Sequence, residues 1–184
     1  ILEYWTSSRD AFLEIIKEES SAYDLPAEVP YAFRALRPWV KNGWEMVLIA
    51  AELARNSSLL SISGPKHFAD QYQQNCNESL KIWGWSPQKL QITLDNVRKR
   101  FIQTNKSKWL ESHIVFPEIK ELINQLPHEN IDFGVLTTKS ARFAAEILNH
   151  LNLYPKILYG YEAGNKPSVL LKIYNNQPIQ GFIE

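Results

Sequence analysis

The chain has 184 residues, of which 45% are hydrophobic and 22% charged, and its formal net charge is zero. This is the composition of a globular protein that buries its core in one domain, or in one domain with a small cap. A balanced charge gives no electrostatic footprint for nucleic acid or for an anionic membrane surface. The longest apolar stretch, MVLIAAELA, is too short to span a bilayer. We therefore expect neither nucleic acid nor a membrane as a partner.

Neither the cysteine nor the basic and histidine residues indicate a site. Cys76 is the only cysteine, which excludes an intramolecular disulfide and favours a reducing, cytoplasmic location. The basic run NVRKRF, residues 96–101, predicts a solvated helix face. The four histidines show no metal-ligand spacing, so we interpret them as ordinary surface or hydrogen-bonded residues.

Apolar residues recur at helical spacing up to about residue 112, in segments bounded by Pro, Gly, Asn and Ser. The spacing predicts helices over residues 5–19, 29–37, 43–55, 65–83 and 86–104. In the first helix Ser8 is the predicted N-cap, and Phe12, Ile15 and Ile16 form the apolar stripe. All six tryptophans lie in this part, which indicates helices packed around large aromatic side chains.

The pattern changes after residue 112. A helix that begins at Pro117 is followed by strands and helices in alternation, which predicts a parallel sheet with right-handed crossovers. The predicted strands are IDFGVLT (131–137), KILYG (156–160) and IQGFIE (179–184), and the predicted helices between them are SARFAAEILNHL (140–151) and KPSVLLKIYNN (166–176). We therefore predict an α/β protein with two domains, an all-helical one over residues 1–112 and an α/β one over residues 113–184.

Polar groups follow each predicted strand. They are Thr137 and Thr138 with Ser140 as the next helix cap, then Lys166 at a helix start, then Glu184. In parallel sheets, ligands bind at the carboxyl ends of strands, where helix N-termini present free N–H groups. Threonine and lysine donate to phosphate oxygens, and a carboxylate binds Mg²⁺. Each residue alone is also an ordinary helix-entry or loop residue, but their order along the chain predicts a phosphoryl site with a divalent cation.

The motifs FGVLTTKS, GNKPSVLLKI and GFIE resemble motifs two, three and four of the haloacid dehalogenase superfamily of phosphohydrolases. The helical first part resembles the C1 cap of its phosphoglycolate phosphatase and β-phosphoglucomutase branch. The resemblance implies a Rossmann-like parallel sheet core with an N-terminal helical cap, Mg²⁺ as cofactor and a small phosphorylated metabolite as substrate. It implies catalytic roles for Thr137 and Lys166, a phosphate contact for Thr138 and a Mg²⁺ ligand in Glu184.

The chain departs from this family in one respect. The first motif, an Asp-x-Asp that supplies the nucleophile and the general acid, is absent, because no aspartate has another two residues away. The sequence begins at Ile1 without a Met and ends beside the fourth motif. We therefore expect a fragment of a Mg²⁺-dependent phosphatase that acts through an aspartyl-phosphate. Its catalytic aspartates are expected just outside the segment, and the 184 residues alone are expected to be inactive.

Other interpretations of the cap and of the function stay open. Arg34 and Arg37 lie three residues apart on a predicted helical face beside Trp39, as a candidate substrate-binding cluster or, more commonly, as surface arginines with packed stems. The chain is also compatible with a non-catalytic relative that binds a phosphorylated metabolite or a protein partner. A phosphomutase or a dehalogenase on the same fold is a third alternative. Aspartates immediately outside both ends would favour the phosphatase.

Overall fold

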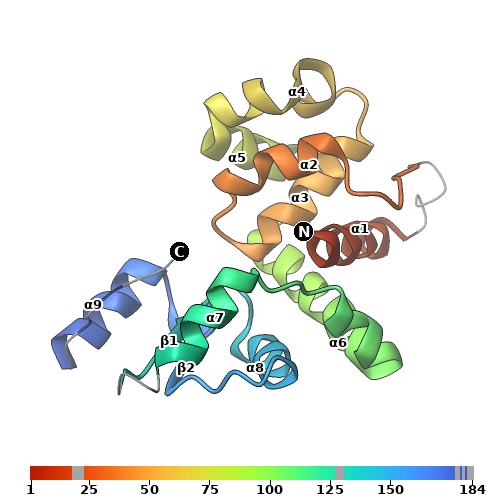
Figure 1. The fold of residues 1–184 in the computed structure, drawn as a ribbon. Helices are drawn as coiled ribbons and strands as arrows, with labels where there is room; N and C mark the ends of the chain where they lie inside the picture. The colour runs from red at the N-terminus through yellow and green to blue at the C-terminus, as the bar shows by residue number, and fades with distance from the viewer. Residues whose placement is uncertain (18–22, 127–130, 177–178, 180, 182–184) are drawn as a thin grey trace. The chain divides into compact units, whose positions relative to one another are not determined.

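A computed structural model describes residues 1–17, 23–126, 131–176, 179 and 181 of the chain (Figure 1). It divides into two compact units, Ile1–His113 and Ile114–Glu184, which we call the helical unit and the α/β unit. The predicted domain boundary lies between residues 112 and 113, and the interpretation of the two units as a cap and a catalytic core stays a prediction.

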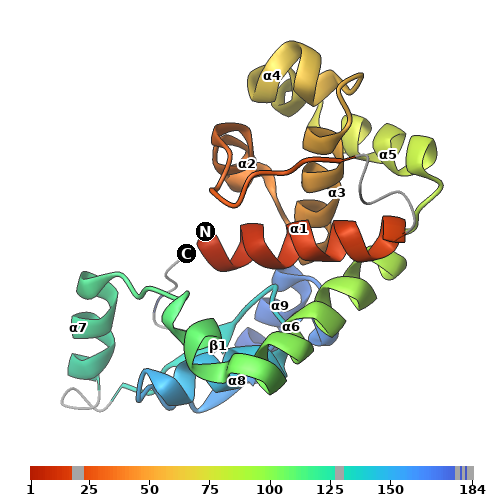
Figure 2. The same ribbon diagram turned by 90° about the vertical axis from the view of Figure 1, so that its right-hand side faces the viewer.

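The helical unit packs around three helices. Its elements are α1 (Leu2–Ile16), α2 (Tyr31–Leu36), η2 (Arg37–Trp39), α3 (Gly43–Ala54), α4 (Leu59–Asp70), α5 (Tyr72–Trp83) and α6 (Pro87–Glu111). Helices α1, α3 and α6 pack against one another, and Figure 2 shows α1 along its length with α3 on one side and α6 on the other. Residues 45–52 of α3 are all buried, because this helix is apolar around most of its circumference.

The first helix begins earlier than predicted. It starts at Leu2, and Ser8, the predicted N-cap, lies in its middle, where it is fully buried. Trp5, Ser8 and Phe12 are spaced by three and four residues, so they share the packed face of α1. The prediction was wrong because a serine near the start of an apolar run suits a cap and also suits a tightly packed face, where its small size helps.

Two other predicted helices differ from the helices in the structure. The single helix predicted over residues 65–83 is two helices, α4 and α5, with Gln71 between them. Gly64 breaks the first of these with φ of 80°, a conformation that glycine adopts without a steric penalty. The long helix α6 contains a break at Asn105, next to the predicted end at residue 104.

Aromatic side chains fill one end of the helical core, as the tryptophan distribution predicted. The ring of Phe12 packs edge-on against those of Tyr23 and Trp83, with centroids 5.5 and 5.8 Å away. Trp83 stacks on Trp85 at 4.6 Å. These contacts join α1 to the end of α5, and aromatic pairs of this kind contribute about 0.5–1.5 kcal/mol each beyond their buried area.

The basic run at residues 96–101 is not wholly a solvated face. Arg98 is 1% exposed, and its Nε donates to the carboxylate of Glu3 at 2.7 Å, in a helix 95 residues away in sequence. Burial alone would lower the pKa of Arg98, but the neighbouring Glu3 carboxylate outweighs it and raises the pKa. Lys99 and Arg100 are exposed as predicted. The prediction failed at Arg98 because its partner is remote in sequence.

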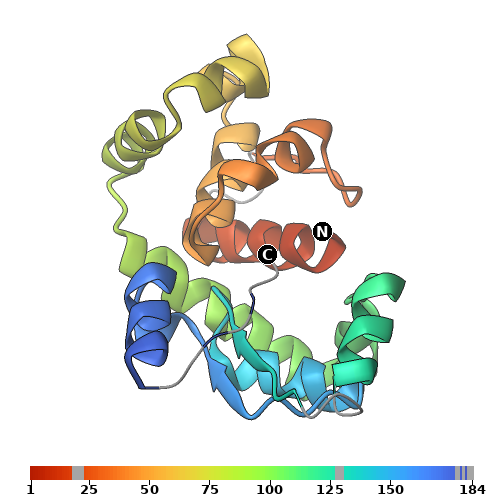
Figure 3. The same cartoon turned by 60° about the vertical axis from the view of Figure 1, so that its left-hand side comes forward.

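The α/β unit contains the predicted alternation. Its elements are α7 (Pro117–Gln125), β1 (Gly134–Leu136), α8 (Ala141–His150), β2 (Ile157–Tyr159), η4 (Tyr161–Ala163) and α9 (Lys166–Asn176). Strands β1 and β2 are parallel, with Val135 opposite Leu158. Figure 3 shows them side by side, with α9 on one side and α7 on the other. The α/β class is thus confirmed, as a small parallel sheet in a mostly helical chain.

The third predicted strand, residues 179–184, falls largely on positions 180 and 182–184, which lie outside the described residues. Within the part of the chain that is described, no helix combines the length and the apolar character needed to cross a membrane.

Candidate functional site

Thr137 directly follows β1 and begins the loop that carries the predicted phosphate donors. Its N–H donates to the carbonyl of Tyr159 at 2.9 Å, which extends the ladder between β1 and β2 by one residue. Its Oγ1 accepts a hydrogen bond from the N–H of Lys139 at 3.1 Å. The Thr137 hydroxyl is therefore held by its own loop in a short side-chain turn, and Thr138 beside it is half-buried.

Ser140 occupies the N-cap position of α8 as predicted, but its side chain makes no capping hydrogen bond. The N–H of Ala141, in the first turn of α8, donates instead to Oε2 of Glu162 at 3.2 Å. Glu162 lies 21 residues later, in the loop that follows β2. A carboxylate is favourable at a helix N-terminus because the helix dipole presents partial positive charge there. The cap of α8 is thus supplied by the neighbouring loop.

The loops after β1 and β2 approach each other closely at Gly160. The N–H of Tyr161 donates to the carbonyl of Lys139 at 3.2 Å. A Cβ placed on Gly160 would lie 2.2 Å from the backbone nitrogen of Ala141 and 2.9 Å from the Lys139 carbonyl oxygen. No side chain fits in that space, so glycine is required here by the approach of two backbones.

Lys166 is the first residue of α9, where the sequence predicted it. Asn165 caps this helix, because its Oδ1 accepts a hydrogen bond from the N–H of Ser168 at 2.9 Å. Lys166 is half-buried, and Val169 one turn on is 3% exposed. Gly164 precedes the cap with φ of 112°, a conformation that disfavours other residues. The start of α9 is therefore fixed by local hydrogen bonding and by one buried side chain.

The structure does not test the positions of the remaining predicted site residues relative to these loops. Glu184 lies outside the described residues. Arg34 and Arg37 belong to the other unit and are both exposed. The guanidinium of Arg37 lies over the ring of Tyr4, with its Cζ 5.5 Å from the centroid. The predicted role of both arginines in substrate binding stays a prediction.

Magnesium requires a set of oxygen ligands. Among the residues that the structure describes, no three of His, Cys, Asp or Glu come together as a metal-ion site. The described residues of the strand-end loops therefore do not by themselves provide the ligands for Mg²⁺. The predicted ligand Glu184 is not among the described residues.

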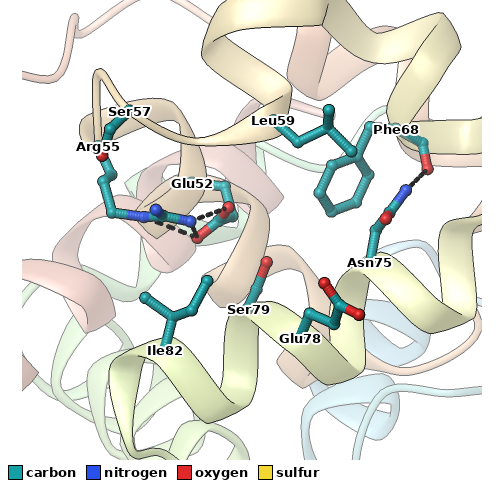
Figure 4. A pocket seen from close by; sticks show the side chains of 9 residues that line it. All are labelled: Glu52, Arg55, Ser57, Leu59, Phe68, Asn75, Glu78, Ser79 and Ile82. Atoms are coloured by element: carbon teal, nitrogen blue, oxygen red, sulfur yellow. Dashed lines mark hydrogen bonds and ion pairs between the residues drawn. The ribbon is translucent and has the colours of Figure 1, made fainter.

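A pocket of about 130 Å³ lies in the helical unit, between α3, α4 and α5 (Figure 4). The Glu52 carboxylate at its wall accepts hydrogen bonds from Arg55 at 2.7 Å and from the Trp83 indole N–H at 2.8 Å. The Asn75 amide donates to the carbonyl of Phe68 at 2.9 Å. The Glu52 carboxylate and the Asn75 amide are thus already engaged by neighbouring groups, and none of the residues predicted for the phosphoryl site lines the pocket.

The sequence-based reasoning missed Gly160 and Glu162. Gly160 ends the predicted strand KILYG and Glu162 lies two residues beyond it, so the argument that selected Thr137 would also have selected an acidic residue just after β2. The signal was present, but a glycine and a glutamate after a strand are common loop residues. The hydrogen bond to Ala141 of α8 distinguishes Glu162 from an ordinary loop residue, and the close approach of the Ala141 and Lys139 backbones distinguishes Gly160.

Comparison with protein families agrees with this arrangement. The family model described as haloacid dehalogenase-like hydrolase matches residues 47–180. The match covers well over half of the chain and includes the loops after both strands, so the chain belongs to the haloacid dehalogenase-like hydrolase family. Searches of curated proteins and of solved structures gave no significant match. The resemblance in the motifs is therefore confirmed at the level of the family, and the family is one of hydrolases.

Proposed function

We propose that the protein is a phosphomonoester hydrolase that acts on a small phosphorylated metabolite. The observation that carries this proposal is the joining of the two strand-end loops, with Thr137 at the end of β1 and Lys166 at the start of the helix that follows β2. Family membership supports hydrolase chemistry at this edge of the sheet. The carboxyl edge of a parallel sheet is where such folds bind their ligands.

The proposed roles follow from the chemistry of each group. The Thr137 hydroxyl and the Thr138 backbone or side chain donate to phosphoryl oxygens, and the Lys166 ammonium offsets the charge on them. An aspartate outside residues 1–184 attacks phosphorus and displaces the alcohol, which a second aspartate protonates. Water then hydrolyses the aspartyl-phosphate. On this proposal the 184 residues alone have no turnover, since the nucleophile is not among them.

Mg²⁺ dependence is part of the proposal. Its support is the family and the acidic residue Glu184 at the end of the fourth motif. The described residues do not by themselves supply a metal site. Arg34 and Arg37 are proposed to contact the substrate from the helical unit.

A second candidate is a non-catalytic relative that binds a phosphorylated ligand through the same loops. One observation favours it, namely that no Asp-x-Asp occurs in the 184 residues. The two candidates predict the same ligand chemistry and differ only in turnover.

The test is a phosphatase screen of the full protein, with its natural flanking sequence, over a panel of phosphomonoesters with and without Mg²⁺. Lys166→Ala is expected to lower kcat by about 10²–10³-fold, the usual cost of losing a donor to a transition-state oxyanion. Lys172→Ala is the matched control, because Lys172 is an exposed lysine on the same helix, and it should leave kcat within about twofold.

Turnover that requires Mg²⁺ and that Lys166→Ala abolishes supports the hydrolase. A folded protein that binds phosphomonoesters without turnover supports the binding relative. Equal loss of activity in Lys166→Ala and Lys172→Ala would contradict the assignment of Lys166.

A further inference from the structure

Glu162 connects the two loops of the candidate site. Its Oε2 accepts a hydrogen bond from the N–H of Ala141 at 3.2 Å, although the two residues are 21 positions apart in the sequence. Ala141 begins α8, directly after the loop that contains Thr137 and Thr138. Glu162 belongs to η4, directly after β2. One carboxylate thus bridges the segment after β1 and the segment after β2.

The contact is built into the backbone around it. The missing side chain of Gly160 leaves room for the Glu162 carboxylate, since a Cβ there would lie 2.2 Å from Oε2. The adjacent hydrogen bond from Tyr161 to the carbonyl of Lys139 holds the same two loops together at 3.2 Å. Ser140, which has the side chain usual for capping α8, does not cap it. The Ser140 side chain therefore does not cap α8, and the carboxylate of Glu162 from the loop after β2 does so instead.

Glu162 also lies close to Lys166 along the chain. Four positions separate them, and the intervening backbone is constrained by the turn of η4, by Gly164 at φ of 112° and by the Asn165 cap. A segment this short transmits a shift of its anchored end to its other end, because few rotatable bonds remain to absorb it. Anchoring Glu162 to α8 therefore restricts where Lys166 can lie relative to the start of α8.

We propose that Glu162 is a positioning residue, which fixes the loop of Lys166 against the loop of Thr137 so that both donors address one phosphoryl group. This inference rests on the proposed function for its catalytic consequence. The contact between the loops can be tested separately. Glu162 acts through Ala141 and has no assigned contact with the substrate.

The first arm tests the contact without any use of activity. Native-state hydrogen exchange of the Ala141 amide is measured by NMR in the full protein and in the Glu162→Ala and Glu162→Gln variants. Loss of the acceptor should speed exchange of this amide about tenfold in Glu162→Ala. Glutamine keeps an acceptor oxygen at the same reach, so exchange in Glu162→Gln should stay within about threefold of the wild type. Glu121→Ala, which removes an exposed glutamate of α7, is the control.

The second arm measures kcat and KM with p-nitrophenyl phosphate, together with the thermal midpoint of each variant. Glu162→Ala should lower kcat about tenfold or more with a small change in the midpoint, because a misplaced donor loses transition-state stabilisation. Glu162→Gln should restore kcat to within about threefold. A purely structural role would lower the midpoint and leave kcat of the folded fraction unchanged, and that result would overturn the proposal.

The two arms separate the possible failures. Faster exchange with a lower kcat, both restored by glutamine, supports the proposal. Unchanged exchange at Ala141 in Glu162→Ala overturns it, whatever the activity. If the wild type turns over but Glu162→Ala is as active, the inference fails and the hydrolase stands. If the wild type has no turnover on any phosphomonoester, the hydrolase fails, and exchange at Ala141 still decides whether Glu162 joins the loops.

Discussion

The helical unit and the α/β unit are each stabilised by a different kind of internal interaction. In the helical unit, α1, α3 and α6 enclose a continuous apolar core and a buried ion pair. In the α/β unit, few of the described side chains are fully buried. Its buried apolar residues are Phe143, Ala144, Leu153 and Val169, and its buried polar residues are Lys139 and Ser140. Much of its described order therefore comes from backbone hydrogen bonds between β1, β2 and the loops that follow them.

This difference in packing agrees with the proposal that the phosphoryl site lies in the α/β unit. A large packed core resists local opening, whereas loops held by a few exposed hydrogen bonds open more readily. Ligand-binding residues are often found on loops of the second kind, positioned by a small rigid scaffold. The candidate phosphoryl site lies on such loops in the α/β unit. The comparison predicts that substitutions in the helical unit cost more stability, and that substitutions at the strand ends act locally.

The largest effect is expected at the buried ion pair of the helical unit. Arg98→Ala removes the guanidinium that pairs with the buried Glu3 carboxylate, and the Ser7 hydroxyl that also donates to Glu3 does not replace its charge. This should lower the free energy of unfolding by about 3–5 kcal/mol. The measurement is urea denaturation followed by tryptophan fluorescence, since all six tryptophans lie in this unit. Arg100→Ala is the matched control on the same helix, because Arg100 pairs with Glu14 at the surface. That pair should contribute at most about 1 kcal/mol. Equal losses in both variants would contradict the difference in burial.

A smaller and local effect is expected at Gly160. In Gly160→Ala the new methyl group would overlap the backbone of Ala141 and Lys139, and strain of this kind costs about 1–3 kcal/mol. Hydrogen exchange should accelerate at the amides of Tyr161 and Ala141 and remain unchanged in α3. Gly181→Ala is the control, since a Cβ there meets nothing within 4 Å. Faster exchange throughout α3 would show that the two units do not respond separately.

The third effect depends on pH and belongs to the helical unit. Burial, together with the Glu45 carboxylate, raises the pKa of the Cys76 thiol from 9.0 to about 12. Below pH 9 the thiol is neutral in both states and the shift has no effect. Between about pH 9 and 12 the unfolded chain loses this proton and the folded chain keeps it. Stability should therefore fall in that window, by at most about 1.4 kcal/mol per pH unit.

Denaturation curves of the wild type and of Cys76→Ala, compared from pH 8 to 11, isolate this contribution. The two curves should run parallel up to about pH 9 and converge or cross above it. Tyr72, which donates to Glu45 at 2.8 Å, is present in both proteins, and its pKa is raised mainly by burial and then by Cys76. Because burial persists in Cys76→Ala, Tyr72 should stay protonated in both folded proteins up to pH 11 and affect the two curves similarly. Curves that stay parallel to pH 11 would contradict a retained thiol proton.

The sequence by itself determined the alternation of strands and helices after residue 112. The range predicted for the last helix, residues 166–176, agrees with that of α9. It also supplied the motifs around Thr137 and Lys166 that led to the family. These features are local, since periodicity, turn residues and helix starts are set by neighbours within a few positions.

Only the tertiary structure decided which polar residues are buried and what they contact. Arg98 has its partner 95 residues away, Ser8 lies on a packed face, and Glu162 caps a helix that begins 21 residues before it. In each case the local pattern was compatible with a solvated face, a cap or an ordinary loop. The free energy of burying a polar group depends on the group that comes to meet it, and that group is chosen by the fold rather than by the adjacent sequence.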